Sequence, residues 1–330
     1  MGSGKMGIAA NPFICFSYPY FYSQMLQVIR LPNLIIVAIT QYLLQYLVLT
    51  PALDEAGMKP ILDPLHFALL VLTTISIAAG GYLINDIIDY KTDLINKPTR
   101  VVINKKISFR TATNIYLLFT TVGAVIASYL AHHVGNILLF FIYPFAVLLL
   151  YLYSLHLKKT SLWGNFVVSA FCAGVAGIVL FAERKTFTEI KWTHPGLANK
   201  VSVIFIGYFI FAFVATLTRE IIKDIEDMEG DQKTGLRTYP IVHGMESARN
   251  LSVLISFILF VALDISAYWL FMHEEWAGFA FMIFCLIGPV CFIIVYLKKS
   301  EIKQHFSTLS KLTKWIMLAG LLLLIIIWKF

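Results

Sequence analysis

The stretch Gly80-Gly81-Tyr82-Leu83-Ile84-Asn85-Asp86-Ile87-Ile88-Asp89-Tyr90-Lys91-Thr92-Asp93 begins as an apolar helix and turns acidic within one step. On a helix, Asn85, Asp89 and Asp93 follow the spacing i, i+4 and i+8, so their oxygen atoms form one stripe with Asp86 beside it. Carboxylates held this close repel one another and usually need cations. The stretch therefore predicts a membrane helix whose end carries a cation-binding face.

A second acidic run, Asp224-Ile225-Glu226-Asp227-Met228-Glu229-Gly230-Asp231, follows another apolar segment. Asp224, Asp227 and Asp231 are spaced at i, i+3 and i+7, again on one face of a helix. Two such runs, each at the end of a membrane helix, indicate a site for a hard metal ion that faces a charged ligand.

The composition is that of an integral membrane protein. Of the 330 residues, 59% are hydrophobic and only 14% are charged, and the mean hydropathy is +0.78, whereas about a quarter of a soluble domain is charged. The net charge of +7 does not indicate nucleic-acid binding, because the basic residues lie between hydrophobic segments rather than in one patch. The four cysteines show no metal-like spacing.

Nine apolar runs are long enough to cross a bilayer. They lie near residues 31–50, 65–84, 113–131, 135–155, 164–183, 201–218, 251–271, 277–297 and 313–330. We therefore expect an all-α, polytopic membrane protein, a bundle of nine transmembrane helices. Residues 30–330 form one domain in this prediction, and residues 1–29 form an N-terminal tail, part of which we expect to come from an expression tag.

The basic residues predict the orientation of the bundle. With the N-terminus inside, the cytoplasmic segments hold all of the 26 Lys and Arg residues except Lys59, Arg184, Lys185, Lys191, Lys200 and Lys329. This bias predicts a multi-pass protein of the cell membrane with the N-terminus inside and the C-terminus outside. Both acidic runs then face the cytoplasm.

Two facing acidic stripes suit a diphosphate ester, since Mg²⁺ keeps a few carboxylates and takes phosphate oxygens for its other positions. The basic residues near enough in sequence to complete such a site are Lys97, Arg100, Lys105, Lys158 and Lys223. The many aromatic residues (26 Phe, 16 Tyr and 6 Trp) suit a long isoprenoid tail and could stabilise a carbocation by cation–π attraction.

Two acidic patterns in this chain resemble the paired aspartate-rich signature of the UbiA superfamily of intramembrane prenyltransferases. They are Asn85-Asp86-x-x-Asp89-x-x-x-Asp93 and, later in the chain, Asp224-x-x-Asp227-x-x-x-Asp231. Arg30-Leu31-Pro32-Asn33 resembles that family's entry motif before the first helix. A third stretch resembles the family's connection between the fourth and fifth helices: Tyr153-Ser154-Leu155-His156-Leu157-Lys158-Lys159, with Gly164-Asn165. The similarity extends from about Arg30 through the last helix.

The resemblance implies that magnesium held by both motifs binds an allylic diphosphate and promotes its departure, and that an acceptor captures the allyl cation. The implied metal ligands or their close supports are Asn85, Asp89, Asp93, Asp227 and Asp231, while Asp86 and Asp224 would support the ligands from behind or serve as alternative ligands. Lys97, Arg100, Lys158 and Tyr153 would contact the diphosphate, while Arg30 and Asn33 would face the acceptor.

Within the family, the stretches 219–231 and 94–98 look most like the digeranylgeranylglyceryl phosphate synthase branch. That branch attaches a geranylgeranyl group to the hydroxyl of a prenylated glycerol phosphate and so forms an ether. The chain departs from the pattern at Thr99-Arg100-Val101, where a second Arg-Pro pair is expected, and at Asn104, which occupies a usual glycine position. An aromatic quinone precursor is the alternative acceptor.

Other functions remain open from the residues alone. The acids could be the solvated end of a membrane helix, and the basic residues around Lys97 could anchor lipid headgroups or set the topology. A cation transporter would relay ions through intramembrane acids, but it is expected to carry them near helix midpoints. A family member acting as a cyclase or as a non-catalytic scaffold would carry the same motifs.

Overall fold

The computed structural model describes residues 25–96 and 101–327 of the chain. Within this part, nine helical segments are long and apolar enough to cross a membrane, and the only β pairing is an isolated bridge between Ile103 and Ile107. The predicted all-α fold of nine spans is confirmed, and each predicted apolar run overlaps one of these segments. The division into a tail and one domain stays a prediction.

In chain order the helices are α2 (Leu31–Leu43), η1 (Leu44–Leu49), α3 (Thr50–Glu55), α4 (Pro64–Asn96), α5 (Phe109–Val134), α6 (Ile137–Leu155), η2 (Leu157–Lys159), α7 (Trp163–Ala182), α8 (Arg184–Thr193), α9 (Pro195–Lys233), α10 (Tyr239–His243), α11 (Met245–Met272), α12 (Trp276–Met282), η3 (Ile283–Ile287), α13 (Gly288–Lys298) and α14 (Lys303–Ile326).

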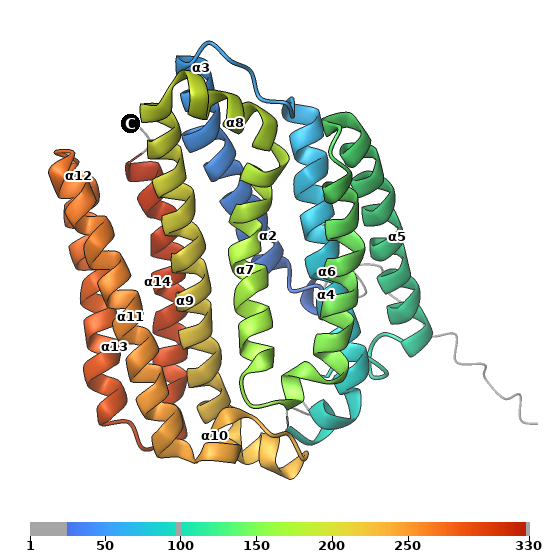
Figure 1. Ribbon diagram of the computed structural model, residues 1–330. Helices are drawn as coiled ribbons and strands as arrows, with labels where there is room; N and C mark the ends of the chain where they lie inside the picture. Colours follow the sequence, from blue (N-terminus) through green and yellow to red (C-terminus); the bar gives the residue numbers. More distant parts are fainter. Residues whose placement is uncertain (1–24, 97–100, 328–330) are drawn as a thin grey trace, which may run out of the picture.

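Two helices, α4 and α9, are much longer than a bilayer requires. With 33 and 39 residues and a rise of about 1.5 Å per residue, both exceed a hydrocarbon core of about 30 Å. Their apolar parts span the bundle, and their acidic last turns continue as regular helix. Both acidic ends lie at the end of the bundle that carries α10, while α3 and α8 lie at the opposite end (Figure 1).

The first and eighth spans contain short π-helical segments, η1 and η3. Each lies directly before a proline near the start of the next helix, Pro51 and Pro289. Proline donates no backbone hydrogen bond, and its ring crowds the carbonyl four residues earlier, so a wider turn before it relieves the clash. These interruptions carry no acidic residue.

Local signals explain how the other helices begin and end. The short turn between the third and fourth spans is made by Gly135, with a φ of 63°, and Asn136, whose side chain accepts a hydrogen bond from Leu138 N.

The segment 184–200, expected to be an outer loop, instead begins with the helix α8. Its one buried face packs against the bundle, with Ile190 buried.

Buried side chains join the helices around a single large core that runs from Leu44 to Ile327. Gln41 on α2 reaches two other helices, since its amide nitrogen donates to Thr74 Oγ1 on α4 at 3.0 Å and to Val175 O on α7 at 3.3 Å. The outer faces of α5 and α6, in contrast, expose large apolar residues such as Leu118 and Phe145. A face of this kind belongs in a lipid bilayer, and the chain is a multi-pass membrane protein.

Candidate active site

The short helix η2 brings a lysine onto the acidic face of α4. Lys158 Nζ donates to Asn85 Oδ1 at 3.2 Å and forms an ion pair with Asp89 Oδ1. The connection can approach α7 this closely because residue 164 is glycine: a Cβ there would lie 2.8 Å from Lys158 Cα. Two of the three residues predicted on this stripe, Asn85 and Asp89, therefore have their oxygen atoms at one cationic group.

The entry motif before α2 packs on the same helix. Arg30 has a left-handed backbone (φ 54°), and its guanidinium donates to Asp86 Oδ1 at 3.0 Å while lying 4.6 Å above the centre of the Tyr82 ring. The Asn33 amide donates to the Tyr82 hydroxyl at 3.3 Å. Asp86 is thus held by Arg30 beside the stripe, and the two residues expected to face the acceptor are fixed to α4.

The second acidic run is supported by α7. Asp224 on α9 accepts a hydrogen bond of 2.8 Å from the amide nitrogen of Asn165. One turn earlier on α9, Glu220 pairs with Arg219 at 2.7 Å and with Lys223 at 3.8 Å. The run therefore carries its own basic partners on the helix.

Charges from both helices act on Tyr153, in the last turn of α6. The hydroxyl is subject to the charges of Asp89 on α4, of Glu220 and Asp224 on α9, and of Arg30. The helices α4 and α9 also contact each other directly. The structure thus brings together residues from the entry motif, both acidic runs and the connection after α6.

The remaining predicted residues lie farther along the same helices or outside the described part of the chain. Asp93 follows Asp89 by one turn on α4, and Asp227 and Asp231 continue the stripe on α9, all three half-buried. Lys97 and Arg100 fall outside the described residues. The roles of these five residues, like the catalytic and ligand roles of the other predicted site residues, stay predictions.

The oxygen donors fit a magnesium ion that shares its coordination with a phosphate. Within the described residues, no three His, Cys, Asp or Glu side chains are grouped so as to hold an ion by themselves. Mg²⁺, however, is usually bound through one or two carboxylates together with water and substrate phosphates. Asn85 and Asp89, which already meet at a cationic group, provide oxygens of this kind.

Three residues near the site were missed by the sequence reasoning: Tyr82, Asn165 and Glu220. Tyr82 and Glu220 each precede a predicted acid, Asp86 and Asp224, by four residues, so extending each stripe by one turn would have found them. Asn165 belongs to the motif Gly164-Asn165 identified above, but its contact with Asp224 could not be predicted, because that contact depends on how α7 packs against α9.

Two other residues singled out in the sequence are explained by their place in the fold. Asn104, at the expected glycine position, has a φ of 60°; asparagine is among the few residues other than glycine that tolerate this left-handed region. Its amide donates to the Tyr90 hydroxyl on α4 at 3.2 Å. Asp264 is an exposed residue of α11, a helix that contributes no residue to the site described above.

Comparison with known proteins gives consistent matches. A family model described as "UbiA prenyltransferase family" matches residues 56–315. A digeranylgeranylglyceryl phosphate synthase of Sulfurisphaera tokodaii is 31% identical over 248 residues, which cover 75% of this chain and 79% of that protein. A similar synthase of Methanocaldococcus jannaschii is 30% identical over 80% of this chain and 85% of its own length.

Solved structures share the fold. A structure from work on digeranylgeranylglyceryl phosphate synthase aligns with a TM-score of 0.63 at 24% identity and covers 92% of this chain and 97% of that chain. An apo structure of a UbiA homolog from Aeropyrum pernix K1 aligns with a TM-score of 0.58 at 12% identity, over 91% of this chain and 97% of that chain. At these identities the likeness concerns the fold alone.

Proposed function

Because this chain belongs to the UbiA prenyltransferase family and is an intramembrane prenyltransferase, we propose that it moves a geranylgeranyl group from its diphosphate to geranylgeranylglyceryl phosphate, forming an ether lipid. The similarity to synthases of that product supports this choice of acceptor. The observation that carries the proposal is the contact of Lys158 with Asn85 and Asp89 on the first acidic run, beside Tyr153, whose hydroxyl is subject to the charges of Asp89 and of Glu220 and Asp224 on α9.

The chain's residues have distinct tasks in the proposed reaction. The bond between the allylic carbon and the diphosphate oxygen breaks, and the acceptor hydroxyl oxygen then bonds to that carbon and loses its proton. Lys158 would stabilise the departing diphosphate with its charge, a role supported by the position of its ammonium group beside Asn85 and Asp89. Mg²⁺ bound by the acids of both runs would neutralise further negative charge on the leaving group.

The acceptor would lie beside Arg30. The Arg30 side chain is 43% exposed, so the guanidinium, although paired with Asp86, still presents N–H donors to a ligand. Guanidinium groups bind phosphate through paired hydrogen bonds. This geometry suits an acceptor with a phosphate headgroup whose prenyl chain stays among the apolar helices.

The test is an incubation of the purified protein with Mg²⁺, geranylgeranyl diphosphate and two acceptors in parallel, geranylgeranylglyceryl phosphate and 4-hydroxybenzoate. We expect an ether product from the first acceptor, identified by mass spectrometry. Asp89→Ala and Asp231→Ala should each abolish transfer in folded protein. Asp264→Ala, a matched acid on α11 outside the site, should keep full activity.

Each alternative has its own outcome. Prenylated 4-hydroxybenzoate without the ether would identify an aromatic prenyltransferase, and a cyclised product would identify a cyclase. Full activity of both Asp89→Ala and Asp231→Ala would refute the site. Ion flux through proteoliposomes without any diphosphate would support a transporter instead.

A further inference from the structure

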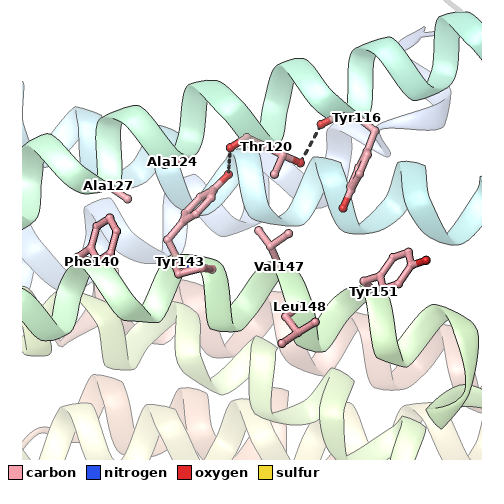
Figure 2. Close-up of a pocket in the computed structure, with 10 residues that line it drawn as sticks. Tyr116, Thr120, Ala124, Ala127, Phe140, Tyr143, Val147, Leu148 and Tyr151 are labelled. Carbon is pink, nitrogen blue, oxygen red and sulfur yellow. Dashed lines mark hydrogen bonds between the residues drawn. The ribbon is translucent and has the colours of Figure 1, made fainter.

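A groove separates α5 from α6 within their membrane-spanning parts. Its volume is 360 Å³, within the range of roughly 300–1,000 Å³ found for ligand pockets. Thr120 and Ala124 of α5 form one wall, and Phe140, Val147 and Tyr151 of α6 form the other (Figure 2). No charged side chain lines it.

A tyrosine holds the two helices in the arrangement that leaves the groove open. Tyr143 points from α6 to α5, where its hydroxyl donates to Thr120 O at 2.9 Å (Figure 2). The same proton is shared with Phe119 O at 3.3 Å. The tyrosine occupies the space beside Gly123, where any Cβ would clash with its hydroxyl. One position further along α5, the small side chain of Ala124 leaves the space beside Tyr143 unfilled.

The side chains that line the groove suit a hydrocarbon chain rather than a polar ligand. The Thr120 hydroxyl already donates to Tyr116 O at 2.8 Å, and the Tyr143 hydroxyl is bonded to the α5 backbone, so neither needs a polar ligand. The other two hydroxyls of the lining, those of Tyr116 and Tyr151, lie at the same end of the groove (Figure 2), and the rest of the lining is apolar. The groove is also continuous with the lipid-facing surface, since one of its lining residues, Leu148, is 55% exposed.

The groove is closed toward the acidic site. The hollow between it and α4 touches Gly80, Gly81 and Ile84, directly before Asn85, but its volume is only 10 Å³. The Leu150 side chain fills the space over Gly81, where a Cβ would lie 2.9 Å from Leu150 Cδ1. A chain in the groove therefore reaches it from the bilayer and not from the diphosphate site.

We propose that the groove between α5 and α6 is a binding site for one hydrocarbon chain of a bilayer lipid, separate from the candidate active site. A bound chain fills the space beside Tyr143 and adds apolar contact along a helix pair that is otherwise open at this level. The proposal does not depend on the acceptor or on prenyl transfer.

The test uses vesicles of phosphatidylcholine that carries a diazirine in one acyl chain. The full-length protein is reconstituted, transferred to detergent micelles to remove loosely associated lipid, and irradiated; labelled residues are then mapped by mass spectrometry. We expect labels on the groove residues Thr120, Ala124 and Val147. Ala124→Phe, which fills the groove, should lose these labels, while Val125→Phe on the lipid-facing side of the same helix should keep them.

Two further variants test whether the labels come from a lipid bound in the groove. Val147→Phe fills the groove from α6 and serves if Ala124→Phe does not fold. Asp89→Ala should be labelled like the unsubstituted protein, which separates this proposal from the proposed reaction. Undiminished labelling in both groove-filling variants, no labelling of groove residues in the unsubstituted protein, or displacement of the lipid by geranylgeranyl diphosphate would each overturn the proposal.

Discussion

At the scale of single residues, the position of Lys158 in the candidate site depends on a glycine that has no functional group of its own. Gly164 lies in the first turn of α7, next to the connection through η2, and a Cβ there would lie 2.8 Å from Lys158 Cα and 3.2 Å from Leu157 O. Both are backbone atoms, so they cannot move aside as the tip of a flexible side chain can. Lys158 is therefore positioned on Asn85 and Asp89 partly by the absence of a side chain at residue 164.

We predict that Gly164→Ala lowers the rate of prenyl transfer on the order of ten- to a hundred-fold, because displacing a binding group by about 1 Å can cost a reaction this much. Gly174→Ala is the matched control on the same helix, since a Cβ there meets no atom within 4 Å. Rates in detergent, with circular dichroism as a check of folding, make the comparison. Equal rates for the two variants would contradict the positioning role.

At the scale of elements, a buried carboxylate joins the segment between α3 and α4 to the corner between α7 and α8. Glu183 is fully buried, and its two carboxylate oxygens accept hydrogen bonds from Ile61 N at 2.8 Å and Leu62 N at 2.9 Å. These backbone groups lie at the end of the bundle opposite the acidic site. Glu183 therefore anchors this connection without taking part in the chemistry.

Glu183→Ala should destabilise the protein, because it removes the acceptors of two backbone N–H groups, and a buried group left unpaired costs about 1–3 kcal/mol. A lower midpoint of thermal unfolding in detergent is the expected result. Glu189→Ala removes an exposed acid from the neighbouring helix α8 and should leave the midpoint nearly unchanged. A midpoint unchanged in Glu183→Ala would show that the anchor contributes nothing.

The same residue predicts a dependence on pH. Burial raises the pKa of Glu183, and the two backbone donors oppose that shift only in part. The folded protein then binds the proton more tightly than the unfolded chain does, so stability falls as pH rises from about 4 through the raised pKa. Relative to Glu183→Gln, which does not titrate, the midpoint of the unsubstituted protein should fall over this range. A constant difference between the two would contradict the raised pKa.

At the scale of the whole molecule, both acidic helix ends lie at one end of the bundle, as the spacing of apolar runs predicted (Figure 1). Which side of the membrane this end faces is a separate prediction. The excess of Lys and Arg in the segments at this end favours the cytoplasm. With nine candidate spans among the described residues, the first span begins and the last span ends at opposite ends of the bundle.

Cysteine labelling in intact cells tests this orientation. In a variant lacking the four native cysteines, Glu301→Cys, between α13 and α14, should resist a membrane-impermeant maleimide until the cells are opened. Glu189→Cys, on α8 at the other end of the bundle, should react in intact cells. Both positions are exposed, so accessibility to the reagent decides the result. The reverse pattern would place the acidic site outside the cell.

The sequence by itself determined the features that depend on local order along the chain. Helical spacing placed Asn85, Asp89 and Asp93 on one stripe, and long apolar runs defined nine spans, because both patterns need only a helix and a bilayer. The tertiary structure alone decided the partners: Arg30 with Asp86, Lys158 with Asp89 and Asn165 with Asp224, which are 56 to 69 residues apart.

The physical reason is that contacts between helices depend on packing, which no local period encodes. The closed passage at Gly81 and the open groove at Ala124 differ because Leu150 fills the first space and no side chain fills the second. Whether a small residue produces close packing or a cavity is decided by the neighbouring helix, and therefore by the folded bundle as a whole.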